Sequence, residues 1–340
     1  MLINNNTLKT TRERVRNTLN FKKCADRLPM VEWVSWWKPT VERWRKEGLN
    51  PALNGDEIND EFGLDKIMFI GAWPVSEECP RPTVEGGSIV TDLASYEKIK
   101  KYLFTEKSIE QAVETAKNLK DYHEKGEAAV RFWMDGCFWF PRSLLGIEGH
   151  LFAFYDQAEL LHRMNEDLTR FNIKVFERVS EVLIPEFVAL AEDMSYNHGP
   201  MLSYELFKEF LLPYYRRLVE AIKPTGCKIL VDSDGDVTEM ISWILEAGID
   251  GIYPHERQAG VDIVKIREQY PELIMMGGFD KMVMDKGEEA IRAEFERIFP
   301  VMKSGGFIPS VDHQTPPNVS LDDYRLYLKL FKEYCTKAVK

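Results

Sequence analysis

The feature that most constrains the fold of this chain is a regular alternation, starting near residue 125, of short apolar runs with amphipathic helical patterns. The runs are "AAVRF" (128–132), "EFVALA" (186–191), "KILV" (228–231), "GIY" (251–253), "LIMM" (273–276) and "GFIPSV" (306–311). A helical pattern follows each run, which is typical of βα units and a parallel sheet. Two earlier runs, "LPMVEWV" (28–34) and "KIMFIG" (66–71), bring the number of predicted strands to eight.

Eight βα units in an uninterrupted chain favour the α/β class, as a single (β/α)8 TIM barrel over residues 1–340. An N-terminal helix near residues 8–20 is expected outside the barrel. Residues 75–95 lack helical period and are expected to form an excursion such as a hairpin. An open doubly wound sheet is the alternative, although no G-x-G-x-x-G fingerprint follows any predicted strand.

Ionisable residues stand where six successive predicted strands end. They are Asp135, Glu192 with Asp193, Asp232 with Asp234, His255 with Glu256, Asp280 with Lys281, and Asp312 with His313. In a (β/α)8 barrel the carboxyl ends of the strands form the active site, so these side chains are expected at one mouth. A further carboxylate near the third of these ends, Asp236, has a simpler interpretation. A helical pattern starts at Val237, so Asp236 is the expected N-cap, with Glu239 completing a capping box.

Composition excludes several classes of protein. The net charge of −11 argues against a surface for nucleic acid or an anionic membrane, because both need clustered basic residues. The five cysteines form no C-x-x-C pair, which fits a reducing compartment. The sequence shows neither a signal-peptide pattern nor a membrane-spanning run, so a cytoplasmic enzyme or binding protein is expected.

Five motifs make the chain resemble the uroporphyrinogen decarboxylase superfamily, which joins tetrapyrrole decarboxylases to corrinoid-dependent methyltransferases. They are "TRERVRNTLNFKKCADRLPM", "EDMSYNHGPMLSYELFKEFLLPYYRRLVEAIK", "VDSDGDVTEMISWILEAGIDGIYPHE", "MMGGFDK" and "GGFIPSVDHQTPPNVSLDDYRLYLKLF". The resemblance covers nearly the whole chain and is specific for the superfamily, but not for one reaction. It implies a barrel enzyme that often forms homodimers.

Departures from the family pattern favour the methyltransferase branch. The arginine-rich motif and the aspartate that bind tetrapyrrole in true decarboxylases are not in place in "EWVSWWKPTVERW" and "FIGAWPVSE". The related methyltransferases hold zinc with an H-x-C pair and a later Cys; here Asp232-Ser233-Asp234 takes the first place and His313 stands at or beside the second. The resemblance therefore implies a divalent metal, zinc first, held by Asp232, Asp234 and His313.

Each of these residues keeps a structural alternative. Glu192 is expected as a further ligand or as the general acid, and its alternative is an ion pair in the barrel mouth. Asp232 and Asp234 could instead bind backbone amides or pair with Lys281, and His313 could cap a loop. Together, His313, Asp232 and Glu192 are the predicted catalytic residues.

Aromatic and histidine side chains complete the predicted site. Trp36 and Trp37 after the first strand, and Trp139 after another, suit a methoxylated aromatic or a quaternary ammonium compound. His198 and His255 are further predicted substrate contacts, with His255 and Glu256 also suited to orienting a ligand. The histidines at 123, 150 and 162 lie in helical patterns and are interpreted as packing or surface residues.

Three functions follow. The first is transfer of a methyl group between a small methoxylated or methylated substrate and the cobalt of cobalamin on a separate corrinoid protein, since no corrinoid module is recognised in the chain. The second is a decarboxylase of uroporphyrinogen or of a simpler acid. The third is a non-catalytic binding protein for a methylated ligand.

Overall fold

The computed structural model describes residues 10–84 and 86–340. Contacts within it divide the chain into two compact units. Among the described residues, unit 1 holds 10–68, 122–129 and 254–340, and unit 2 holds 69–84, 86–121 and 130–253. Because each unit collects separate stretches of chain, the two are not successive domains. That the whole chain forms one barrel domain stays a prediction.

Parallel strands form the framework of each unit. In unit 2, β2 (Ala128–Asp135), β3 (Phe187–Ala191), β6 (Lys228–Asp232) and β7 (Gly251–Tyr253) pair in that order, and β4 (Ser195–Tyr196) with β5 (Gly199–Pro200) forms a small antiparallel hairpin. In unit 1, β8 (Ile274–Phe279) pairs with β9 (Phe307–Val311). The boundary between the units falls within β1 (Lys66–Ala72), near the start of β2 and near the end of one helix. The strands predicted from residue 66 onward are thus confirmed.

Helices follow most strands. Those of unit 1 are α1 (Thr11–Leu19), α2 (Lys38–Lys46), α3 (Gly55–Glu61), α12 (Ile263–Gln269), α13 (Glu288–Lys303) and α14 (Leu321–Lys337). Those of unit 2 are α4 (Leu93–Ile99), most of α5 (Glu106–Lys125), α6 (Trp139–Leu145), α7 (Ile147–Asp156), α8 (Ala158–Ser180), α9 (Tyr204–Phe210), α10 (Leu212–Ile222) and α11 (Ile241–Glu246). No helix of the described residues combines the length and apolarity that crossing a membrane requires.

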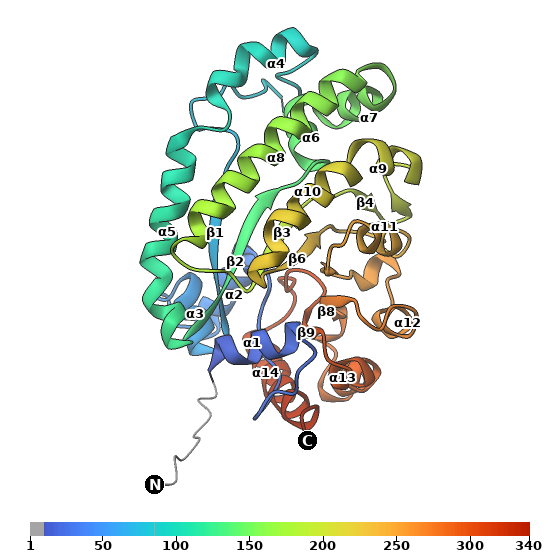
Figure 1. Cartoon of the computed structure of the whole chain (residues 1–340). Coiled ribbons are helices and arrows are strands. Elements are labelled where there is room, and N and C mark those ends of the chain that lie inside the picture. The colour runs from blue at the N-terminus through green and yellow to red at the C-terminus, as the bar shows by residue number, and fades with distance from the viewer. Residues whose placement is uncertain (1–9, 85) are drawn as a thin grey trace. The chain divides into compact units, whose positions relative to one another are not determined.

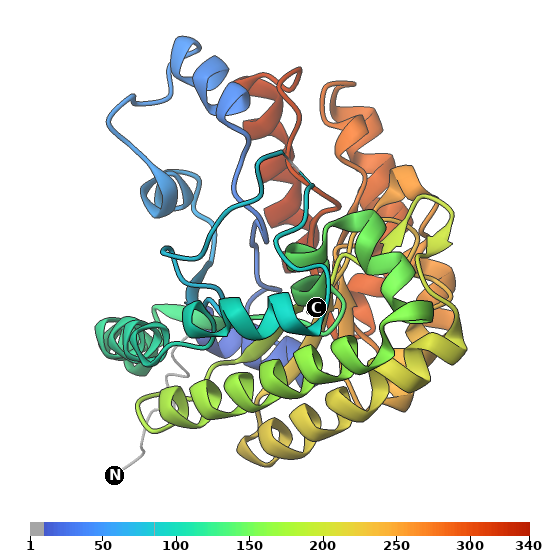
Figure 2. The ribbon, with the colours of Figure 1, turned by 90° about the horizontal axis from the view of Figure 1, so that it is seen from above.

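Helix packing follows the 3.6-residue period of the sequence. In α14 the buried residues include Tyr324, Tyr327 and Phe331, and Ser320 caps the helix by accepting a hydrogen bond from the Asp323 amide. In unit 2, α8 and α10 lie side by side along the sheet, in yellow-green and yellow (Figure 1), and Figure 2 shows the same pair from above. All residues of β3, β8 and β9 are buried, which explains their continuous apolar runs.

The predicted first strand, 28–34, does not form. Its backbone groups bond elsewhere: the Met30 amide donates to the Asp65 carboxylate at 2.9 Å, and the Leu28 amide donates to the carbonyl of Cys335 at 3.1 Å. Pro29 has no amide proton to offer a ladder. The α/β class with parallel βα units is confirmed, but a closed eight-stranded barrel is not found among the described residues.

Three local predictions have mixed outcomes. The N-terminal helix is confirmed as α1, while residues 8 and 9 of its predicted range lie outside the described residues. The helix predicted from Val237 begins only at Ile241, because residues 237–240 form a turn and Asp236 accepts from the Thr238 amide at 3.0 Å. The described part of 75–95 forms no hairpin; Val75 makes one isolated bridge, with Leu103, and α4 begins at Leu93.

Candidate functional site

The carboxyl ends of the strands in unit 2 place four residues in one row. Asp135, Ala191, Asp232 and Tyr253 are successive register partners on β2, β3, β6 and β7. Register partners of parallel strands point to the same face of a sheet, so both carboxyls and the phenol share one face. The sequence predicted these strand ends; the pairing explains why they meet.

Both carboxyls of this row are buried, and their protonation responds to that burial. Burial raises the pKa of Asp135 to about 7, although a hydrogen bond from the Trp133 side chain opposes this shift. Burial also raises the pKa of Asp232 to about 7; Arg131 opposes the shift, the nearby Asp193 and Asp234 add to it, and a hydrogen bond with Tyr253 opposes it. Near neutral pH each group is therefore able to donate or accept a proton.

A cavity of about 370 Å³ opens beside Asp135 within unit 2. Trp73 and Trp139 contribute indole rings to its lining, and the loop after β1 and the start of α5 supply the other walls. Trp73 is 50% exposed. The guanidinium of Arg142 lies over the Trp139 ring, 5.2 Å from the ring centroid. Trp139 thus lines a cavity, and its role as a substrate contact stays a prediction. Trp73 and Asp135 were not predicted to bind substrate.

The carboxylate of Glu192 is enclosed by hydrogen-bond donors and does not line an open barrel mouth. We call this group of donors the cradle of Glu192. The carboxylate accepts from the amides of Cys137 at 2.8 Å, Phe138 at 2.7 Å and Trp139 at 3.1 Å, and from the Tyr215 hydroxyl. The side chain is completely buried, and burial raises its pKa to about 7 although all four donors oppose the shift. These bonds anchor the start of α6, so a structural role accounts for every contact of Glu192.

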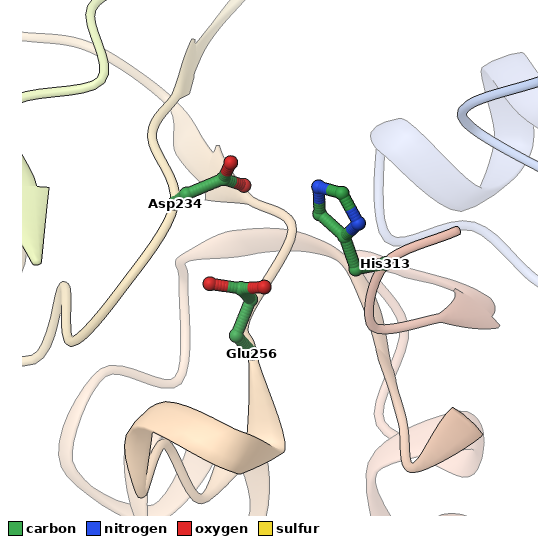
Figure 3. Close-up of side chains that lie close together, drawn as sticks. All are labelled: Asp234, Glu256 and His313. Atoms are coloured by element: carbon green, nitrogen blue, oxygen red, sulfur yellow. The ribbon is translucent and has the colours of Figure 1, made fainter. Parts of the chain in front are cut away.

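In unit 1, Glu256 and His313 lie close together. A carboxylate oxygen of Glu256 and a ring nitrogen of His313 are within 4.8 Å of one another. Figure 3 shows both side chains, with His313 extending from the segment after β9 toward Glu256. The ring of His313 also meets Trp33 edge-on, at 5.8 Å between ring centroids. Both side chains are half-buried.

Asp312 explains why Glu256 and His313 approach. Its completely buried carboxylate accepts from the amide of Arg257 at 3.0 Å and from the amide and ammonium of Lys281 at 3.2 and 3.3 Å. The neighbours of Glu256 and of His313 in the chain are therefore tied to each other. Lys281, predicted as an alternative partner for Asp232 or Asp234, pairs with Asp312.

Glu32 is a half-buried acid of unit 1 with two hydroxyl partners. It accepts from the Tyr324 hydroxyl at 2.8 Å and from the Ser310 hydroxyl at 3.3 Å. Burial raises its pKa to about 8 against these two hydrogen bonds. Trp36, a predicted substrate contact, donates to the same Tyr324 hydroxyl at 3.2 Å and packs edge-on against Trp44, so it belongs to a packed aromatic cluster.

The remaining predicted substrate contacts differ in exposure. Trp37 precedes α2 and is 44% exposed. His198 is exposed in the β4–β5 hairpin, with its ring edge-on to Tyr196. His255 is completely buried and has φ +67°, an unusual backbone conformation outside glycine. None of these roles is tested by the geometry, so they stay predictions.

Four residues of the sites described above were not among the ligands or substrate contacts predicted from the sequence. Glu256 and Asp135 stand at predicted strand ends and carried that signal, but neither entered the predicted ligand or substrate set. Trp73 closely follows β1 and Glu32 lies in the misassigned segment 28–34, so only the structure relates them to acids and rings.

The chain matches the family model described as Uroporphyrinogen decarboxylase (URO-D) over residues 75–334. A curated relative, uroporphyrinogen decarboxylase of Chlorobium limicola, is 24% identical over 168 residues, which are 47% of this chain and 47% of that protein. The chain thus spans about half the length of this relative. A methyltransferase from Methanosarcina mazei has a similar fold, with a TM-score of 0.62 and 15% identity over 95% of this chain and 98% of that chain. Since the family match extends over more than half of its residues, the chain belongs to the uroporphyrinogen decarboxylase family.

Proposed function

We propose that this protein transfers a methyl group between a small methoxylated or methylated substrate and the cobalt of a separate corrinoid protein. The observation that carries this proposal is the approach of Glu256 and His313, an oxygen and a nitrogen ligand tied together through Asp312. Family membership and the fold shared with a methyltransferase support it.

Glu256 and His313 fit a divalent cation. Zinc binds carboxylate oxygen and imidazole nitrogen at about 2.0–2.2 Å, so two ligands of one ion lie within about 4 Å of each other. A separation below 4.8 Å needs little side-chain movement to meet that condition. We propose Asp234 as the third ligand, in the place where the related methyltransferases have part of their zinc motif.

When bound, the ion supplies Lewis-acid stabilisation of the heteroatom that loses or gains the methyl group. The chain itself holds the two ligands in place. Asp312, which precedes His313, accepts from the amide of Arg257, which follows Glu256, and this bond holds the two ligand segments together. Asp232 interacts with Arg131 and Tyr253. We therefore assign Asp232 to orienting the end of β6 and not to binding the metal directly.

Zinc titration and methyl transfer to free cob(I)alamin, followed by the absorbance of methylcobalamin, test the proposal. The wild type is expected to bind one zinc ion and to form methylcobalamin from a methoxylated compound. His313→Ala, Glu256→Gln and Asp234→Asn should each weaken zinc binding on the order of 100-fold, since removing a ligand costs at least as much as removing its outer-shell partner. Glu268→Gln, an exposed glutamate on α12, is the matched control and should change nothing.

A wild type that cannot be loaded with zinc, or variants that bind zinc as tightly as the wild type does, would defeat the metal assignment. If only Asp234→Asn binds normally, the third ligand is wrong while Glu256 and His313 stand.

Decarboxylation is a second candidate, because family membership covers it and because Asp135 and Asp232 have pKa values near 7, suited to protonating the carbon that loses carbon dioxide. Release of carbon dioxide from uroporphyrinogen, together with an absence of methylcobalamin, would favour it. Ligand binding without either reaction would favour the non-catalytic alternative.

A further inference from the structure

The cavity of unit 2 has flat, rigid walls. Trp73 presents a half-exposed indole, and its carbonyl is fixed by the Ser108 hydroxyl, which donates at 2.7 Å. Trp139 lies at the start of α6, whose amides bond to Glu192. Pro74 and Pro80 add apolar surface, while more than half of the lining residues are polar or charged. Two indole rings with apolar side chains beside them suit a planar ring, which loses little conformational freedom on binding.

The volume of the cavity suits a ligand of one or two rings. A dry cavity of about 150 Å³ accepts benzene, so about 370 Å³ accommodates a ring with two or three substituents. Four rings would need roughly 600 Å³ on the same scale, before their side chains are counted. A tetrapyrrole therefore does not fit within this cavity.

Asp135 is a buried acid in the lining of the cavity. The residue is 7% exposed, and the Trp133 side chain is a hydrogen-bond partner of its carboxyl. A carboxyl has more hydrogen-bonding capacity than that one donor uses. A ligand oxygen carried into the cavity would find a partner there, whereas a purely apolar ring would leave Asp135 desolvated and underused.

The charges of the walls do not favour a cation. Besides Asp135, the charged residues of the lining are two acids and two bases, Glu77, Glu78, Arg81 and Lys107. Lys107 lies 3.6 Å from Glu78, and the Trp139 ring already has the guanidinium of Arg142 over it. A quaternary ammonium would compete with that guanidinium for the ring.

We infer that this cavity binds an uncharged aromatic compound with a ring oxygen, the ring lying against Trp73 and Trp139 and the oxygen directed to Asp135. The inference rests on the proposed function only in taking such a compound as the methyl donor. The binding site itself consists of unit 2 residues alone. Asp135 and Trp73 then determine which substrate is accepted, independently of the residues proposed to hold metal.

Calorimetric titration of the full chain with 2-methoxyphenol tests the inference. The titration is done in EDTA and without any corrinoid, so its result does not depend on metal binding or on methyl transfer. The wild type should bind 2-methoxyphenol measurably. Asp135→Ala and Trp73→Ala should each raise the Kd about tenfold, the loss expected for one hydrogen bond or one ring contact. Tyr122→Ala, which removes a side chain with 51% exposure, is the matched control and should bind like the wild type.

Asp135→Asn guards against misfolding, because it keeps the shape and hydrogen-bonding capacity of the side chain; it should bind more tightly than Asp135→Ala. An unchanged Kd in both Asp135→Ala and Trp73→Ala would overturn the inference. So would tighter binding of tetramethylammonium than of 2-methoxyphenol, or binding of neither compound by the wild type.

Discussion

Replacing Glu192 by leucine distinguishes its buried cradle from the metal-ligand role that the sequence predicted. The substitution keeps a side chain of similar size but removes the acceptor of three backbone amides and of the Tyr215 hydroxyl. A buried donor left without a partner costs about 1–3 kcal/mol, and leucine regains about 2 kcal/mol by burying apolar surface. For four donors the expected loss in the free energy of unfolding is roughly 2–10 kcal/mol, which is comparable to the 5–15 kcal/mol typical of a folded protein.

Urea unfolding followed by circular dichroism, in EDTA, measures this loss. Glu110→Leu, on the exposed surface of α5, is the control and should stay within about 0.5 kcal/mol of the wild type. If Glu192 were mainly a metal ligand, metal-free Glu192→Leu would unfold at the wild-type urea concentration while losing metal affinity. That result would refute the structural role assigned to the cradle.

Two further predictions concern stability. Burial raises the pKa to about 7 for Asp135, Glu192 and Asp232 and to about 8 for Glu32, so each acid holds a proton in the folded state that the unfolded chain has already released. The contribution of these protonated acids to the free energy of unfolding is complete below about pH 4 and is lost as the pH rises through 7 to 8. The urea concentration at the midpoint of unfolding, measured in EDTA, should therefore fall between about pH 5 and 8.5. A midpoint that rises over this range would contradict the assigned pKa shifts. Gly277→Ala should cost about 2–4 kcal/mol, because Gly277 has φ +97° and a Cβ there would lie 2.0 Å from the Pro254 carbonyl oxygen. Gly260→Ala, at φ +90° with nothing within 4 Å of its Cβ, should cost only about 1–2 kcal/mol, and equal losses for the two variants would show that the close contact is not the cause.

The sequence by itself determined where most of the strands lie and what stands at their ends. Runs such as 228–231 are apolar because parallel strands are covered on both faces, and that requirement is local enough to leave a pattern in the chain. The acids at positions 135, 192 and 232 follow such runs directly, so their positions at or just after strand ends could be predicted. The segment 28–34 has the same apolar composition but bonds to Asp65 and Cys335, distant residues that no local pattern reveals.

Only the tertiary structure decided what each of these side chains does. Glu192 and Asp232 carry the same signal in the sequence, yet one is enclosed by amides that begin α6 and the other lies beside Arg131 and Tyr253. The same applies to Glu256, whose approach to His313 depends on the hydrogen bonds of Asp312 to two other segments. A carboxylate becomes a ligand, an acid or a cap according to the donors within about 3 Å of it, and long-range packing, which leaves no periodic trace in the sequence, brings those donors together.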